Sequence, residues 1–207
     1  MVITYYGNEY FKIQQGDLTL ALNPPSRKAE PKAPQFGADV GLITMHHPLF
    51  DGVDTISYGG TAPFIIDGPG EYEAKSIFVK GFLNETTYEG KKKVNTLYYA
   101  VVEGIKLCFA GALSTPVLDP ATREELYDVD ILFVPVGGGE VLDAAAAQKL
   151  ARGLEAKLII PMHYDAPALK DFLKQAGAEG VAPLDKLTIK KKDLEGKEGE
   201  VVVLAIA

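Results

Sequence analysis

Two histidines and an aspartate of this chain have the chemistry of metal ligands. His47 follows an apolar segment and Asp51 follows it closely in the sequence, whereas His163 follows a second apolar segment. Imidazole nitrogens and carboxylate oxygens are donors that zinc and manganese accept. His46 precedes His47, but adjacent side chains of an extended segment point to opposite faces, so only one of the two is expected to point inward. His47, His163 and Asp51 are therefore the candidate ligands of a single metal site.

Three other features suggest chemistry with less support. Cys108 lies in a strand-like segment without a visible base, which favours a buried structural thiol. Ser114 could be a nucleophile with His163 and Asp165, but no motif such as G-x-S-x-G marks it. Gly137–Gly139 lies between a predicted strand and a predicted helix, where backbone amides could bind phosphate. Acidic residues follow at once, so these glycines are more simply explained by a tight turn.

The composition excludes several classes of protein. The length of 207 residues, with 47% hydrophobic and 24% charged residues, is typical of a globular protein with a single domain, residues 1–207. The net charge of −7 disfavours nucleic-acid binding. No apolar run is long enough for a membrane helix, and no signal peptide is visible. The single cysteine fits a reducing compartment, so a cytoplasmic location is expected.

The first half of the chain has the two-residue alternation of β-strands. Segments 11–15 and 18–22 alternate around a turn at Gly16–Asp17, and a proline-rich loop follows. Val40–Met45 and Pro63–Ile66 are apolar enough for strands in the middle of a sheet. Three further strands are predicted at Ile77–Phe82, Thr96–Val102 and Ile105–Ala110, with a polar loop or hairpin tip over Asn84–Lys93.

The second half alternates between strands and helices. Helices are predicted over Pro120–Leu126 with Asp119 as N-cap, over 144–154 with Asp143 as N-cap, and over Pro167–Gln175 with Gly177 as the stop. Strands are predicted at Ile131–Val136, Leu158–Ile160, Leu187–Lys191 and Val201–Ile206. This order predicts an α+β fold in which two mixed sheets pack face to face with helices outside.

The arrangement resembles the αββα sandwich of the metallo-β-lactamase superfamily. The similarity extends over nearly the whole chain and is greatest to the zinc-dependent hydrolase branch related to ascorbate-6-phosphate lactonases. It rests on the segments Met1–Gly7, Gly37–Val40, Ile66–Glu73, Asn95–Tyr98, Val134–Gly139 and Ile160–Tyr164. The resemblance implies a hydrolase ancestry and a site in which about seven His and Asp side chains hold two metal ions.

Most of the ligands that the resemblance implies are replaced in this chain. The superfamily motif T-H-x-H-x-D-H corresponds to T-M-H-H-P-L-F over Thr44–Phe50, and no histidine lies between Gly81 and Asn95. The bridging Asp of the family segment G-D-L-G corresponds to Ala112. His47 and His163 remain, whereas a catalytic zinc site normally has three protein ligands. The replacements are Met45, Leu49, Phe50 and Ala112, which are apolar and favour burial.

Two functions of different classes follow. The first is a hydrolase homologue that has lost its metal centre, has no cofactor and acts by binding or assembly, with an unknown small-molecule ligand or as a homo-oligomer. The second is a metal-dependent phosphoester or lactone hydrolase that uses a reduced zinc or manganese site at His47, His163 and Asp51 or another carboxylate. Glu71, Glu73, Asp67 and Glu85 are the other candidate carboxylates.

Overall fold

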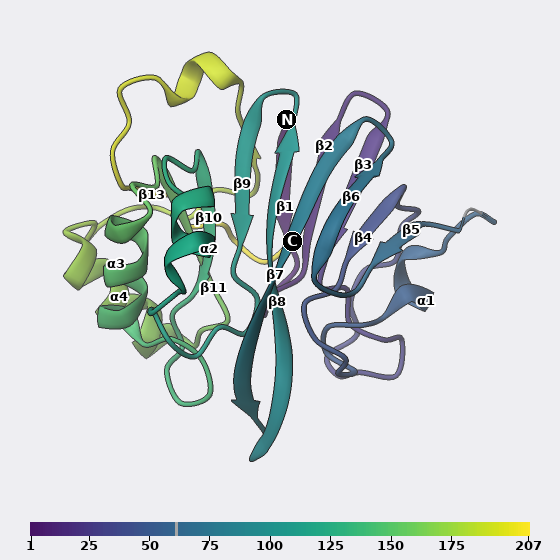
Figure 1. Ribbon diagram of the computed structural model, residues 1–207, viewed down its shortest axis with the longest axis horizontal. Helices are drawn as coiled ribbons and strands as arrows, with labels where there is room; N and C mark the ends of the chain where they lie inside the picture. The colour runs from purple at the N-terminus through teal and green to yellow at the C-terminus, as the bar shows by residue number, and fades with distance from the viewer. Residues whose placement is uncertain (61) are drawn as a thin grey trace.

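A computed structural model describes residues 1–60 and 62–207, in which two β-sheets face each other (Figure 1). Both sheets mix parallel and antiparallel pairs, as the sequence predicts. The first sheet has the order β12 (Leu187–Thr188), β1 (Val2–Tyr5), β2 (Phe11–Gln15), β3 (Leu18–Leu22), β4 (Val40–Leu42) and β5 (Phe64–Ile66). The second sheet has the order β13 (Glu200–Val201), β11 (Leu158–Met162), β10 (Ile131–Pro135), β9 (Ile105–Phe109), β8 (Lys91–Val102), β7 (Ile77–Tyr88) and β6 (Gly70–Ala74).

The main hydrophobic core lies between the two sheets. Alternate residues of β2 are buried because Phe11 and Ile13 point to the other sheet, whereas Lys12 points away from it. The Phe11 ring contacts Phe133 of β10 with 4.9 Å between the ring centroids, in an edge-to-face arrangement. Such a pair adds about 0.5–1.5 kcal/mol beyond its buried area, so it helps to fix the two sheets against each other.

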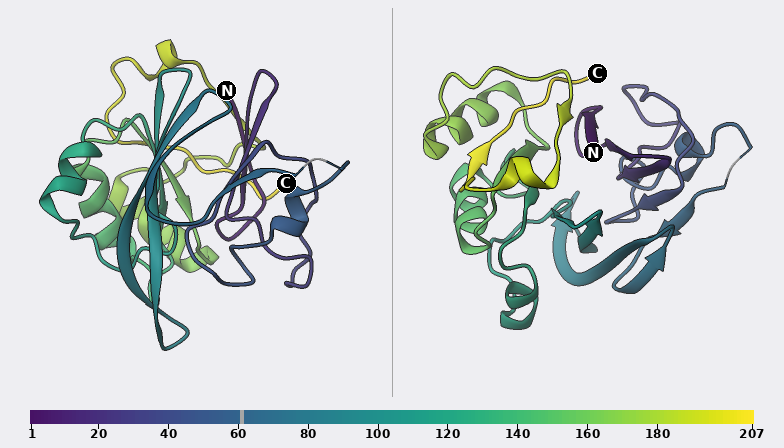
Figure 2. Two further views of the ribbon diagram at one scale, coloured as in Figure 1. Left: turned by 45° about the vertical axis from the view of Figure 1, so that its right-hand side comes forward. Right: turned by 90° about the horizontal axis from the view of Figure 1, so that it is seen from above.

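Helices cover the outer faces of both sheets, which completes the αββα sandwich (Figures 1 and 2). On the seven-stranded sheet, α2 (Pro120–Glu125), α3 (Ala144–Gly153) and α4 (Ala166–Ala176) pack on a second core, to which α3 contributes Ala147 and Leu150. On the six-stranded sheet, α1 (Val53–Ile56) contributes Ile56 to a smaller cluster. The fold class that the sequence predicts is therefore confirmed.

The helix ends agree with the capping residues in the sequence. The carboxylates of Asp119 and Asp143 accept hydrogen bonds from the backbone N–H groups of Thr122 and Ala146, so both predicted N-caps are confirmed. Gly177 ends α4 in the left-handed conformation with φ 66°, which glycine adopts without steric cost. The predicted helix boundaries are correct to within about two residues for this reason.

The segment Asn84–Lys93 is the end of a hairpin and not an open loop, and its strands extend further than predicted. β7 and β8 form one long hairpin, and only Glu89 and Gly90 connect them. Both of these residues have positive φ, as a tight two-residue hairpin turn requires. The polar composition was misleading because one face of the hairpin is exposed, whereas Thr86 and Tyr88 point to the buried face. Figure 1 shows that the end of this hairpin extends beyond the other strands of its sheet.

Other strand predictions also need correction. β4 ends at Leu42, because the chain turns there toward the histidines. β5 is an edge strand in which Phe64 is 48% exposed, so it does not lie in the middle of the sheet. The two C-terminal strands contain two residues each, and a 3-10 helix over Lys191–Leu194 replaces the end of the first one. The edge strand β6 and the short helix α1 were not predicted.

The segments that carry the predicted ligands begin where strands end, and these strand ends lie close to one another. β9, β10 and β11 are parallel, so Ala112 after β9 and His163 after β11 emerge at the same edge. The backbone N–H of Thr96 in β8 donates to the carbonyl of Thr44 at 2.7 Å, which brings the segment after β4 against the long hairpin. Within the described ranges, no helix is long and apolar enough to cross a membrane.

Candidate functional site

His163 is held in a constrained backbone conformation at the end of β11. Its φ is +51°, and its N–H donates to the carbonyl of Asn8 at 2.7 Å. A side chain at Gly137 would place a Cβ atom 2.2 Å from the His163 carbonyl oxygen, so only glycine allows this approach. The Gly137–Gly139 segment thus serves a close approach between two loops, which agrees with its interpretation as a turn.

Glu9 is the residue that orients His163, and sequence analysis missed it. Its side chain is fully buried, and one carboxylate oxygen lies 2.6 Å from His163 Nδ1. The other oxygen accepts a hydrogen bond of 2.6 Å from the Asn23 side chain. A buried carboxylate is costly unless it is paired and hydrogen-bonded, and here both oxygens have partners. The only visible signal was one charged residue within the aromatic segment Tyr5–Phe11.

The Glu9 contacts continue into a buried polar network. Asn23 Nδ2 also donates to Thr44 Oγ1 at 2.8 Å, and the Thr44 N–H donates to Asn23 Oδ1 at 2.8 Å. This network joins the loops after β1, β3 and β4 to the end of β11. The bonds among Glu9, Asn23 and Thr44 are made between buried groups, so they fix the Glu9 carboxylate that contacts the His163 imidazole.

His47 points inward, whereas His46 points to solvent. The His47 side chain is 12% exposed and that of His46 is 71% exposed, which confirms that only one of the two faces the interior. His47 Nδ1 accepts from the backbone N–H of Leu49 at 3.3 Å, and His47 Nε2 lies 3.3 Å from Glu89 Oε1. Both ring nitrogens of His47 therefore already have partners within the chain.

An apolar cluster fills the space beside the two imidazoles. The Phe50 ring lies 5.6 Å from the His47 ring and 6.2 Å from the His163 ring, measured between centroids. The Tyr88 ring lies 5.2 Å and 6.3 Å from the same two rings. The apolar cluster consists of Met45, Phe50, Tyr88, Ala112 and Val141, with Leu49 packed against it.

Tyr88 brings a hydroxyl group to this otherwise apolar cluster. Burial is the main cause that raises its pKa to about 12, and the carboxylates of Glu9, Glu140 and Glu89 raise it further. The hydroxyl is therefore protonated at neutral pH.

Asp51 lies beside His46 and not at the inward-facing histidines. Its carboxylate oxygen is 3.8 Å from His46 Nδ1, and the Asp67 carboxylate is 3.9 Å from His46 Nε2. The two carboxylates approach opposite nitrogens of one ring, so they do not converge on a common point. Of the other candidate carboxylates, Glu71 pairs with Lys80 at 2.9 Å, and Glu73 and Glu85 are exposed.

Ala112 occupies the position of the implied bridging aspartate and is fully buried. Its N–H donates to Asn95 Oδ1 at 2.9 Å, and its carbonyl accepts from Thr86 Oγ1 at 3.3 Å. A Cβ atom on the neighbouring Gly111 would lie 2.5 Å from Asn95 Oδ1, so this turn is tightly packed. The backbone at Ala112 is thus held by the Asn95 and Thr86 side chains of the long hairpin.

The side chains at this site do not fit a two-metal centre. Among the described residues, His47 and His163 are the histidines of the superfamily motif that face inward, the buried Glu9 carboxylate already contacts His163, and apolar residues occupy the other motif positions. Within residues 1–60 and 62–207, no group of three or more His, Cys, Asp or Glu side chains is placed to hold a metal ion. A catalytic zinc site requires about three such ligands around one ion, which this arrangement does not supply.

The alternative nucleophiles have other surroundings. Asp165 accepts from the Ala168 N–H at the start of α4, whereas the carboxylate that contacts His163 is Glu9, which agrees with the low weight given to a Ser114–His163–Asp165 triad. Ser114 is exposed, and no hydrogen bond joins it to His163 among the described residues. Cys108 is fully buried, which raises the pKa of its thiol to about 12, as a structural thiol requires.

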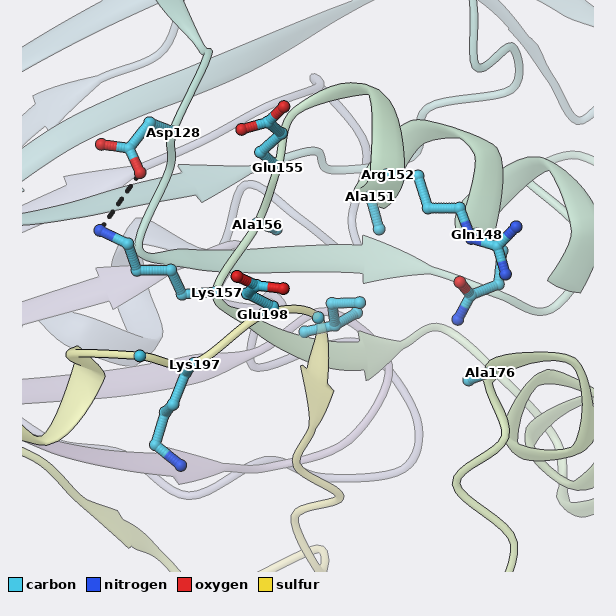
Figure 3. Close-up of a pocket in the computed structure, with 13 residues that line it drawn as sticks. Asp128, Gln148, Ala151, Arg152, Glu155, Ala156, Lys157, Ala176, Lys197 and Glu198 are labelled. Carbon is cyan, nitrogen blue, oxygen red and sulfur yellow. Dashed lines mark ion pairs between the residues drawn. The ribbon is translucent and has the colours of Figure 1, made fainter.

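Another cavity lies at the opposite end of the parallel strands. It measures about 730 Å³ and lies where Asp128 and Lys157 precede β10 and β11, whereas His163 follows β11 (Figure 3). Small side chains of α3 and α4 line it, together with charged groups of the loop before β13. Lys157 already pairs with Asp128 at 3.2 Å, as the dashed line in Figure 3 shows.

Comparisons with known proteins agree with the fold. The β-lactamase superfamily domain matches residues 2–163. A Listeria innocua protein named a metal-dependent hydrolase is 28% identical over 96% of this chain and 99% of its own length. The crystal structure of a candidate zinc-dependent hydrolase of the metallo-β-lactamase superfamily from Thermotoga maritima has a TM-score of 0.75 and 30% identity over 98% of this chain and 97% of that chain. Igni18, a metallo hydrolase from Ignicoccus hospitalis, shares the fold at 18% identity with a TM-score of 0.62, over 91% of this chain and 99% of that one.

The names of these relatives bear on the cofactor as well as on the fold. They describe metal-dependent enzymes, which runs against the expectation that no cofactor is used and agrees better with the metal-dependent alternative. The names of these relatives imply a metal, whereas this chain has apolar residues at several of the expected ligand positions. With its paired sheets, its outer helices and a domain match that spans residues 2–163, the chain belongs to the metallo-β-lactamase superfamily.

Proposed function

We propose that this chain is a metallo-β-lactamase-fold protein that has lost the two-metal hydrolytic centre and acts by binding. The apolar cluster carries this proposal. Phe50 and Tyr88 each contact both remaining histidines, so aromatic rings occupy the space that ions and substrate would need. Phe50 is fully buried, and its removal from a packed site would cost about 3–5 kcal/mol.

The hydrogen bonds of the two histidines support the same proposal. His163 Nδ1 is engaged by Glu9 and both His47 nitrogens have partners, so binding through these nitrogens would first break existing contacts. His163 Nε2 has no hydrogen bond among the described residues, and the partner of His47 Nε2 is the Glu89 carboxylate at 3.3 Å. A single free imidazole nitrogen is too few donors for tight zinc or manganese binding.

The names of the relatives support a second function, a metal-dependent hydrolase with a reduced site. Its ligands would be His163 and His47 with a carboxylate, for which Glu9 and Glu89 are nearer than Asp51. In that case the metal would supply a polarised water molecule for hydrolysis. The apolar cluster would have to move before such a site could form.

Metal content and turnover distinguish the two functions. We expect purified protein, incubated with zinc or manganese and then desalted, to retain well below one equivalent of either metal by elemental analysis. We also expect no phosphodiesterase or lactonase turnover with either metal added. Stoichiometric metal together with turnover that is lost in His163→Ala, but not in His46→Ala, would establish the hydrolase instead. His46 is the matched control because it is exposed.

A further inference from the structure

A cavity between α2 and α3 has an unusual combination of charge and apolar lining. It measures about 310 Å³ and is lined by residues of α2, of α3 and of the segment before α2, and Figure 1 shows these two helices on the outer side of the seven-stranded sheet. Its apolar lining comes from Val117 and Leu118 before α2 and from Leu150 and Leu154 of α3. Arg123 of α2 and Lys149 of α3 supply its charge. We propose that this cavity binds an apolar organic anion, a carboxylate with an aliphatic or aromatic body.

The charge of the cavity is entirely positive. No aspartate or glutamate lines it, although the whole chain has a net charge of −7. Within the part of the chain that the structure describes, the ion pairs formed within 4.0 Å involve neither Arg123 nor Lys149. These two cations are therefore available to a ligand. A guanidinium group binds a carboxylate through two parallel hydrogen bonds, which favours this anion class.

The backbone of α3 allows Arg123 to reach the cavity. A Cβ atom on Gly153 would lie 3.9 Å from Arg123 Nη2, so the guanidinium lies against the last turn of that helix. Gly153 is itself part of the lining, and its lack of a side chain keeps this wall open. The guanidinium is thus placed at the border between the two helices, where a ligand head group can meet it.

The apolar lining supplies the rest of the ligand specificity. Leu150 and Leu154 are buried and form the floor, whereas Val117 is 66% exposed at the rim. A second hollow of about 380 Å³ shares Leu118 and Arg123 and extends to Tyr127, which is 52% exposed. Ligand cavities of this kind measure about 300–1,000 Å³, so a chain or ring of modest size fits.

The larger cavity of Figure 3 does not have this excess of unpaired positive charge. Its lysines are already paired, since Lys157 contacts Asp128 and Lys197 contacts Glu200. Asp128, Glu155 and Glu198 also line it, so its charges largely cancel. An organic anion would gain little net attraction there, whereas it would meet two unpaired cations in the cavity between α2 and α3.

Decanoate tests the proposal, with decanol as its uncharged counterpart. We expect saturable decanoate binding by isothermal titration calorimetry with a Kd below about 1 mM, and binding at least about ten times weaker for decanol. Arg123→Gln should weaken decanoate binding about tenfold or more, since a charge-assisted pair is lost. Arg152→Gln removes an exposed arginine of α3 outside this cavity and should leave the Kd unchanged.

Each result decides the proposal. Absence of saturable binding, equal affinity for decanol, or equal effects of Arg123→Gln and Arg152→Gln would overturn it. Arg123 is exposed, so its replacement does not threaten folding, and circular dichroism checks this. The measurement needs no added metal and does not involve the histidines. Its outcome is therefore independent of the metal content that tests the proposed function.

Discussion

At the scale of single residues, the site is defined by which donors have partners inside the protein. The resemblance in sequence identified His47 and His163, and the structure places both imidazoles against Phe50 and Tyr88. Glu9 was missed because its partner His163 lies 154 residues away in the sequence. No local pattern encodes such a contact, since it depends on how β11 is brought beside the loop after β1.

The first prediction concerns Glu9. Glu9→Ala should lower the free energy of unfolding by about 2–4 kcal/mol, because it leaves the buried Asn23 amide and the His163 ring without their partner. Glu9→Gln keeps the size and part of the hydrogen bonding, so its loss should be smaller. Urea unfolding at neutral pH measures both. The exposed Glu73 provides the control variant Glu73→Ala, and an equal small effect of all three variants would contradict the role of Glu9.

The second prediction concerns the apolar cluster. Phe50→Ala should lower the free energy of unfolding by about 3–5 kcal/mol, since it empties a fully buried position. Phe64→Ala, at a phenylalanine that is 48% exposed on an edge strand, should cost less than about 1 kcal/mol. Urea titration of both variants gives the comparison. Similar losses for the two would mean that the space beside the histidines is loosely packed and open to ligands.

At the scale of elements, capping chemistry was easier to predict than strand boundaries. Asp143 and Gly177 set the ends of their helices by local hydrogen bonds and backbone conformation, which the sequence encodes directly. The long β7–β8 hairpin was predicted as two shorter strands with a loop or hairpin tip, because exposed polar residues hide the alternation that continues to Tyr88. The short strands β12 and β13 depend on pairing with β1 and β11, which no local sequence reveals.

The third prediction concerns the ion pairs that attach the C-terminal segment. Asp130 is buried before β10 and contacts Lys157 at 2.9 Å and also Lys191 of the 3-10 helix. Burial alone would raise the pKa of Asp130, but the Lys106 N–H and the ammonium groups of Lys191 and Lys157 outweigh it and lower the pKa. Asp130→Asn should therefore cost about 1–3 kcal/mol at neutral pH.

The pH dependence gives the sign of this effect. A carboxylate whose pKa is lower in the folded state stabilises the protein above its unfolded pKa of about 3.9, and the contribution is lost as the pH falls toward the folded pKa. The difference in unfolding free energy between wild type and Asp130→Asn should be constant near neutral pH and shrink below about pH 4. The exposed Asp185 provides the control Asp185→Asn. A difference that does not shrink in acid would show that packing, and not charge, accounts for the loss.

At the scale of the whole molecule, the chain has the superfamily fold, whereas the residues at the expected ligand positions differ from the superfamily motif. The core between the sheets draws on strands from both halves of the chain, which supports the prediction of one domain over residues 1–207. The superfamily fold could be predicted because it depends on many apolar positions, each of which tolerates substitution. The site depends on a few positions, and the replacements Met45, Leu49, Phe50 and Ala112 are sufficient to change it.

The last prediction restores those positions together. A variant with Met45→His, Leu49→Asp, Phe50→His and Ala112→Asp regains four donors beside His47 and His163. Zinc should then raise its midpoint of thermal unfolding, because a ligand that binds only the folded state stabilises it by mass action. The wild-type midpoint should change by less than about 1 °C under the same conditions, since its donors are too few for tight binding. Calorimetry with and without chelator measures both, and a zinc-dependent increase in the wild type would contradict the loss of the metal centre. If the fourfold variant does not fold, Phe50→His with Ala112→Asp supplies the comparison with fewer changes to the core.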